Sequence, residues 1–234
     1  MAQNKPAGFK TRRQSEAKPM AFQEGYERIA DVLYNHDFKD LDPDALTKLT
    51  KFFFLLLEEQ SSHNSTRLRT LREVAIKHFV DCLIVPRIVN LNFPLLDVGT
   101  GPGFPGIPLK ILYPLEQIIL AEGVQKRVEF LKRVREILQL EKLDIIGRQV
   151  SADFEYPVRA VITRAFAEVS ETLNQIQNCL QTGGKLFLMK GPNVDPEIKR
   201  AQETWGSKFK LIEDKPYTLP HTPHERRLLV YQKL

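Results

Sequence analysis

The chain has 234 residues, of which 42% are hydrophobic and 27% charged, the composition of an ordinary globular protein with a sizeable core. Its longest apolar run, residues 52–57, is far shorter than the roughly 20 residues that cross a bilayer, and no apolar segment follows the basic N-terminus as a secretory signal requires. Two cysteines exclude a disulfide framework and are not spaced as metal ligands, so we expect a reduced, cytoplasmic protein without a membrane partner.

Most of the net charge of +5 lies in the first 20 residues. They are polar, include two prolines and show no hydrophobic periodicity, so we predict a disordered basic arm over residues 1–20. A solvated tail and an arm that seeks the phosphates of nucleic acid are both consistent with this charge. The basic residues, set against Glu16, are Lys5, Lys10, Arg12, Arg13 and Lys18.

Residues 21–88 have the pattern of helices. Apolar residues recur at helical spacing from Phe22 to Leu33. The dipeptide Asp42-Pro43 is typical of an N-cap followed by the first residue of a second helix. A third helix is expected over residues 71–85, where Pro86 would stop it. The sequence therefore predicts that residues 21–88 form an N-terminal helical cap.

Residues 89–234 alternate short apolar runs with helical segments. This alternation predicts a doubly wound α/β domain, a Rossmann-like parallel sheet covered by helices on both faces. Only a loop separates the last two strands, so we expect them to pair antiparallel. The predicted strands are Pro94–Val98, Gln117–Ala121, Leu143–Gly147, Ala160–Thr163, Lys185–Lys190, Phe209–Glu213 and Arg227–Gln232.

A loop with four glycines and three prolines, residues 99–108, follows the first predicted strand. Such a loop lies at the sheet edge where α/β proteins bind ligands. Residues 101–106 match the dinucleotide fingerprint G-x-G-x-x-G, but each proline removes a backbone N–H that a pyrophosphate needs. Read from Asp97, the loop instead has the form of an S-adenosylmethionine site, whose ligand carries no phosphate. A nicotinamide cofactor is the less favoured alternative.

Two charged residues follow other predicted strands at the same edge. Glu122 comes after the second strand, where its carboxylate is placed to accept hydrogen bonds from both hydroxyls of a ribose. Arg164 ends the fourth strand, a position that favours a binding role over a surface arginine. The sequence therefore predicts that an adenosine-containing cofactor binds there.

The segment Asp97–Leu109 resembles the motif of the RsmG (GidB) family of small-subunit rRNA guanine-N7 methyltransferases. Its Pro105-Gly106-Ile107-Pro108 continuation is much more specific than the glycines. The resemblance spans about residues 22–234. Further matches are Asn64-Ser65-Thr66, His78–Cys82, Lys126–Leu131, Ile162–Ala167, Met189–Gly191, and Glu225-Arg226 with Leu228–Val230.

The resemblance implies methyl transfer from S-adenosylmethionine to N7 of a guanine in small-subunit rRNA. The expected partner is that rRNA or a ribosomal subunit precursor, with no obligate protein partner. It implies a substrate-side role for Asn64. By position, the residues that it implies at the cofactor are Gly99, Gly101 and Phe104 in the pocket, Glu122 on the ribose, Gln149 and Val150 along the adenine, and Arg164.

The expected chemistry needs neither a general base nor a metal. Guanine N7 carries a lone pair and no proton, so its attack on the methyl group is an in-line displacement that depends on positioning. His221 and His224 lack a third metal ligand, and His78 is expected to pack in its helix. Basic residues at the loop edges that either contact RNA or stay solvated are Arg148, Lys190 and Arg226. The alternatives are a methyltransferase for another RNA or a small molecule, and a non-catalytic module that binds RNA or nucleotides.

Overall fold

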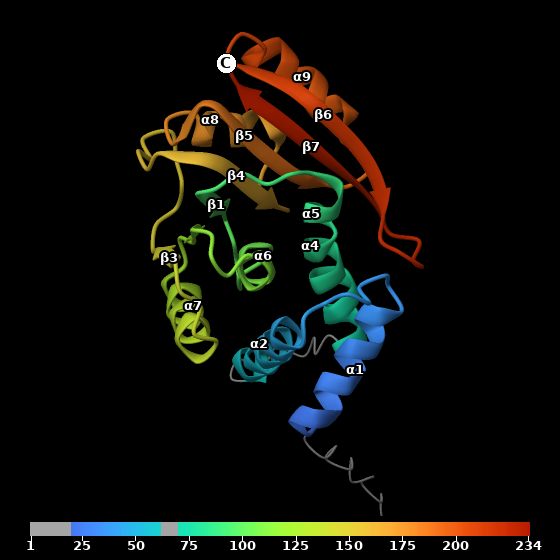
Figure 1. Cartoon of the computed structure of the whole chain (residues 1–234). Coiled ribbons are helices and arrows are strands. Elements are labelled where there is room, and N and C mark those ends of the chain that lie inside the picture. Colours follow the sequence, from blue (N-terminus) through green and yellow to red (C-terminus); the bar gives the residue numbers. More distant parts are fainter. Residues whose placement is uncertain (1–19, 62–69) are drawn as a thin grey trace, which may run out of the picture.

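The computed structural model of the chain describes residues 20–61 and 70–234 (Figure 1). Residues 1–19 of the predicted basic arm lie outside the described residues. Asn64, the predicted substrate contact, also lies outside them. The predictions for the arm and for Asn64 therefore stay predictions.

Seven strands form one sheet in the order β3-β2-β1-β4-β5-β7-β6 (Figure 1). All neighbouring pairs from β3 to β5 are parallel, whereas β7 is antiparallel to both β5 and β6, as predicted. The last three strands are longer than expected. Antiparallel pairing carries β6 and β7 beyond the parallel part of the sheet, whereas β5 begins earlier, where Leu180 pairs with Val158 of β4. The strands are β1 (Leu95–Val98), β2 (Ile118–Ala121), β3 (Leu143–Ile146), β4 (Val158–Arg164), β5 (Leu180–Lys190), β6 (Phe209–Thr218) and β7 (Glu225–Lys233).

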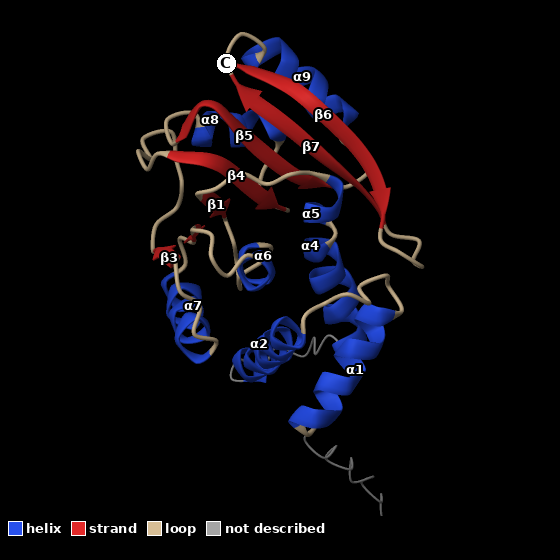
Figure 2. Ribbon diagram, in the orientation of Figure 1, coloured by secondary structure: helices blue, strands red, loops and turns tan. Residues whose placement is uncertain are grey.

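Helices cover both faces of the sheet (Figure 2), which confirms the doubly wound class. Successive residues of a strand point to opposite faces. Leu95 accordingly belongs to the apolar core beneath α6 (Gly106–Leu112) and α7 (Gln125–Ile137). Leu96 belongs to the core beneath α8 (Val169–Ile176) and α9 (Asp195–Trp205).

The predicted N-terminal helices are present, and one of their boundaries differs from the prediction. The carboxylate of Asp42 accepts a 2.7 Å hydrogen bond from Asp44 N and so caps the second helix. Helical structure continues through Pro86 instead of stopping there, because a proline in the first turn of a helix needs no N–H donor. The elements are α1 (Phe22–Tyr34), α2 (Pro43–Ser61), α3 (Leu71–Val74), the π-helix η1 (Ala75–Val80), α4 (Asp81–Leu83) and α5 (Val85–Ile88).

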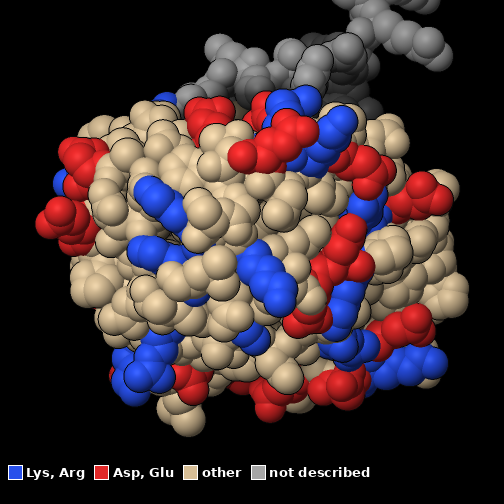
Figure 3. All heavy atoms as spheres, turned by 90° about the horizontal axis from the view of Figure 1, so that it is seen from above, with Lys and Arg blue, Asp and Glu red and all other residues tan. Residues whose placement is uncertain are grey.

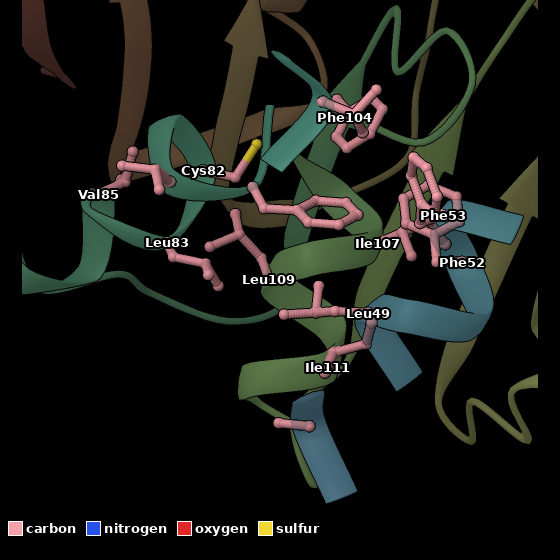
Figure 4. Packing of buried hydrophobic residues seen from close by; sticks show 14 of the residues in the cluster. Leu49, Phe52, Phe53, Cys82, Leu83, Val85, Phe104, Ile107, Leu109 and Ile111 are labelled. Atoms are coloured by element: carbon pink, nitrogen blue, oxygen red, sulfur yellow. The ribbon is translucent and has the colours of Figure 1, made fainter. Parts of the chain in front are cut away.

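The N-terminal helices pack on the α6 face of the sheet through a continuous apolar core. Figure 4 shows Leu49 and Phe52 of α2 beside Ile107 and Ile111 of α6, and all four belong to one buried cluster. The ring of Phe52 also lies 5.2 Å from that of Phe104 in the glycine-rich loop. The division at residue 88 stays a prediction, and the apolar core runs across it.

The surface carries charges of both signs. On the face over β6 and α9, Lys and Arg side chains are interspersed with Asp and Glu (Figure 3). Across residues 20–61 and 70–234, no helix combines the length and apolar character that a membrane crossing needs.

Candidate methyl-donor and RNA site

A cavity of about 890 Å³ opens at the carboxyl ends of β1, β4 and β5. The N-terminal helices and the first residues of β7 complete its walls. It brings together six of the residues predicted for the site: Gly99, Gly101, Phe104, Arg164, Lys190 and Arg226. In the part of the chain that the structure describes, no group of three His, Cys, Asp or Glu side chains is arranged to hold a metal ion.

The glycine-rich loop has a backbone that favours glycine. Gly99 and Gly101 have φ angles of +67° and +61°, in the left-handed region. A Cβ atom on Gly99 would overlap the ring of Phe166, so that position also lacks room for a side chain. A Cβ on Gly101 would meet no atom within 4 Å, because this glycine faces open space at the cavity wall. The backbone at Gly99 and Gly101 thus leaves open space at the cavity wall, here called the cradle, that suits a ligand held close to the backbone.

The buried carboxylate of Asp97 fastens the two ends of this loop. Its Oδ2 accepts hydrogen bonds from Thr100 Oγ1 at 2.6 Å and from Gly106 N at 2.7 Å. Its Oδ1 is buried and has no hydrogen-bond partner within residues 20–61 and 70–234. Burial raises the pKa of Asp97 to about 7, against the opposing effect of these hydrogen bonds. Asp97 does not itself line the cavity, so it acts on a ligand there through the shape of the loop that it fastens.

Glu122 lies directly behind the loop and is almost fully buried. Its Oε2 accepts a 2.9 Å hydrogen bond from Gly101 N, and its Oε1 accepts a 2.8 Å bond from Val124 N. The guanidinium of Arg127 lies 3.6 Å from Oε2. A carboxylate offers about four lone-pair sites, so acceptor capacity remains for the hydroxyls of a ribose. The donor and acceptor set therefore fits the adenosine part of S-adenosylmethionine, although Glu122 does not itself line the cavity.

The residues after β3 lie apart from the cavity. Arg148 is exposed, with its guanidinium 3.7 Å from the carboxylate of Asp153 and 5.0 Å from the ring centre of Phe154. Gln149 is exposed, and Val150 is 2% exposed in the core on the α8 side of the sheet. Contacts of these residues with an adenine or with RNA stay predictions.

Arg164 is tied to the N-terminal helices. Its Nη1 donates to Lys77 O at 3.2 Å and to an oxygen of Asp81 at 3.3 Å. Its Nη2 donates to Nδ1 of His78 at 2.8 Å, since a guanidinium has no acceptor. The guanidinium also lies 5.0 Å from the ring centre of Phe104. Three of its donor hydrogens are thus used by the protein, and its contact with the cofactor stays a prediction.

The sequence named His78–Cys82 as part of the resemblance but did not place His78 or Asp81 at the cavity. His78 packs as expected, on the ring of Phe104, and its ring also borders the cavity. Asp81 is buried and faces the ends of β4 and β7 through Arg164 and Arg226. The signals available in the sequence were the match of His78–Cys82 to the family and the spacing of three residues, which puts His78 and Asp81 on one face of a helix. Nothing local to the helix revealed that the cavity lies on that face.

Lys190 is held at the end of β5. Its Nζ donates to Ala167 O at 2.6 Å and pairs with Glu197 of α9 at 2.8 Å. Its side chain is 14% exposed, so a contact with RNA would have to compete with these partners. Its predicted role toward RNA also stays a prediction.

Solved structures support the fold. The chain superposes on a ribosomal protein L11 methylase from Lactobacillus delbrueckii with a TM-score of 0.52 and 13% identity, covering 71% of this chain and 81% of that one. A predicted O-methyltransferase from Agrobacterium tumefaciens gives a TM-score of 0.51 and 18% identity, covering 66% and 79%. Both likenesses concern the architecture of the sheet and its helices.

Sequence comparison identifies the family. Residues 45–227 match the family model GidB, described as rRNA small subunit methyltransferase G. A ribosomal RNA small subunit methyltransferase G 2 from Bdellovibrio bacteriovorus is 53% identical over 90% of this chain and 83% of its own length. A ribosomal RNA small subunit methyltransferase G from Carboxydothermus hydrogenoformans is 35% identical over 83% and 86%. The resemblance of the glycine-rich loop is thereby confirmed, and the chain belongs to the rRNA small subunit methyltransferase G family.

Proposed function

We infer that this chain transfers the methyl group of S-adenosylmethionine to N7 of a guanine in small-subunit rRNA. Membership of the family makes it an S-adenosylmethionine-dependent rRNA methyltransferase. The observation that carries the cofactor site is the loop at Gly99 and Gly101, whose left-handed backbone opens onto the cavity and is held from behind by Glu122.

The reaction requires the protein to hold the methyl donor and the guanine in line. When bound, the cofactor supplies an electrophilic methyl group on a sulfonium. Guanine N7 has a lone pair and no proton, so no side chain has to remove one. Phe104 and Met189 supply apolar surface to the lining of the cavity. Holding the reactants in line in a dry site accounts for roughly 7–11 kcal/mol of barrier lowering in well-oriented reactions.

The cavity has the charge that an RNA substrate needs. Lys77, Arg127, Arg164, Lys190 and Arg226 all border it. Cations of this kind hold phosphates and so fix the register of a nucleic acid without reading its sequence. The substrate would be the rRNA itself or a ribosomal subunit precursor, with no further protein required, and the reaction would take place in the cytoplasm.

The test is methyl transfer in vitro to small-subunit rRNA from cells that lack the protein. Labelled S-adenosylmethionine supplies the methyl group, and borohydride reduction followed by aniline cleavage locates N7-methylguanine. We expect label on one guanine with the wild-type chain and none with Gly101→Leu, which fills the cradle. Gly183→Leu, a change at another left-handed glycine outside the cavity, is the control. Label on another atom or another class of RNA would contradict the proposal.

A further inference from the structure

One buried carboxylate joins three strand ends to the N-terminal helices. Asp81 begins α4, directly after the π-helix, and its side chain is 4% exposed. Its Oδ2 lies 3.3 Å from Arg164 Nη1 of β4. Its Oδ1 lies 3.3 Å from Arg226 Nε of β7 and accepts a 3.4 Å hydrogen bond from Tyr217 Oη of β6. Asp81 therefore pairs with two arginines of the cavity wall, through a hydrogen bond from Arg164 and an ion pair with Arg226.

The two arginines differ in how many of their N–H donors the protein already uses. Arg164 is 15% exposed, and both of its Nη groups donate to the N-terminal helices. Arg226 is 27% exposed, faces Asp81 with Nε and donates from Nη1 to Glu225 O. Within the described ranges, Nη2 of Arg226 makes no hydrogen bond. Because the guanidinium is a rigid plane, fixing its Nε edge also fixes the direction of its Nη groups.

The local charge balance leaves room for an anion. Lys190 is compensated by Glu197, whereas Arg164 and Arg226 share the single carboxylate of Asp81. Two guanidiniums against one carboxylate leave one positive charge at the cavity wall. A phosphate group suits such a partly buried arginine, which binds it through charge-assisted hydrogen bonds.

We propose that Asp81 is a positioning residue for the RNA substrate, holding Arg226 so that its Nη groups bind a phosphate of the RNA at the cavity. This rests on the proposed function, because it takes RNA to be the substrate of this cavity. Asp81 acts through Arg226 and does not itself contact the RNA.

A positioning role and a purely electrostatic role of Asp81 predict opposite changes in RNA affinity for Asp81→Asn. The substitution removes a negative charge from the cavity wall, so charge alone would tighten the binding of a polyanion. Positioning predicts weaker binding, because an amide holds the guanidinium less firmly than a carboxylate does. The sign of the change therefore separates the two explanations.

The experiment measures the dissociation constant of a small-subunit rRNA transcript by fluorescence anisotropy. The variants are Asp81→Asn, Arg226→Ala and the double variant. We expect each single change to weaken binding about tenfold or more, as for the loss of a hydrogen bond to a charged group. The double variant should bind no more weakly than Arg226→Ala alone, because Asp81 acts through that arginine. For Arg226→Ala, the slope of log affinity against log salt should fall by about one.

Matched controls and a second variant guard against a loss of fold. Asp214→Asn and Arg200→Ala change the same charges on side chains that do not line the cavity and should leave the RNA affinity unchanged. Calorimetric binding of S-adenosylhomocysteine checks that each variant retains a folded cofactor site. Arg226→Lys keeps the charge but has no Nε edge for Asp81, so we expect it to bind RNA nearly as weakly as Arg226→Ala.

Equal or tighter RNA binding by Asp81→Asn overturns the proposal. Losses that add in the double variant, or wild-type affinity in Arg226→Lys, also overturn it. The proposed function fails on a separate result, namely a wild-type chain that transfers no methyl group to guanine N7. Because binding is measured without methyl transfer, the two failures are told apart.

Discussion

The imidazole of His78 stacks on the ring of Phe104, with ring centres 4.8 Å apart and planes inclined by 22°. His78 belongs to the π-helix of the N-terminal segment, and Phe104 to the glycine-rich loop after β1. The ring of Phe104 also lies 5.2 Å from that of Phe52 on α2. One aromatic side chain thus fixes the loop against two helices, so the shape of the cradle depends on this packing.

Replacing Phe104 by alanine is expected to lower both stability and cofactor affinity. Phe104 is 5% exposed, and loss of a buried phenylalanine costs about 3–5 kcal/mol of the free energy of unfolding. Urea denaturation and calorimetric titration with S-adenosylhomocysteine measure the two effects. Leu115→Ala, at a residue that is 78% exposed, should stay within about 0.5 kcal/mol of the wild type. Wild-type affinity in Phe104→Ala would show that the loop keeps its shape without this ring.

Gly101→Ala should weaken cofactor binding far more than it lowers stability. Its φ of +61° costs an alanine about 1–2 kcal/mol, and the new methyl group meets no protein atom but occupies the cradle. Gly183→Ala is the matched control, because its φ is +77°, its surroundings are equally open and it lies outside the cavity. Both variants should therefore lose similar stability, and only Gly101→Ala should lose affinity for S-adenosylhomocysteine. Equal affinities would remove Gly101 from the cofactor site.

Glu122→Gln is expected to loosen the loop and weaken adenosine binding. In the wild type each carboxylate oxygen accepts from one backbone N–H, that of Gly101 or that of Val124. In the amide one of the two oxygens is replaced by an NH2 group, so one of these N–H groups loses its acceptor. A buried N–H left without its acceptor costs about 1–3 kcal/mol. Thermal unfolding and titration with S-adenosylhomocysteine check this, with the exposed Glu129→Gln on α7 as control. A variant with unchanged affinity would place the ribose elsewhere.

The raised pKa of Asp97 predicts a loss of stability as the pH rises. The unfolded carboxyl titrates near 3.8 and the buried one near 7, so between these values the folded state binds more protons. Stability therefore falls through this window, by up to roughly 1.4 kcal/mol per pH unit. Asp97→Asn removes the titrating group, so its stability relative to the wild type should increase from pH 4 to pH 8 in urea denaturation without cofactor. Parallel curves for the two proteins would rule this out.

The sequence predicted those features that depend on local patterns. The alternation of apolar runs and helices gave the parallel sheet, because strands that are buried on both faces are apolar throughout. The loop after β1 could be predicted for a similar reason, because its glycines stand where the local backbone is left-handed. At Pro86 the same local reasoning failed, because the proline falls in the first turn of a new helix and not at the end of the old one.

The sequence by itself determined the family, the segments that form the strands and the loop that holds the candidate cradle. Only the tertiary structure decided how the cavity wall is assembled. Asp81 meets Arg164 and Arg226, which are remote from it along the chain, and His78 meets Phe104 across the boundary predicted at residue 88. The physical reason is that such contacts depend on how the N-terminal helices pack against strand ends, which the periodicity of neither segment encodes.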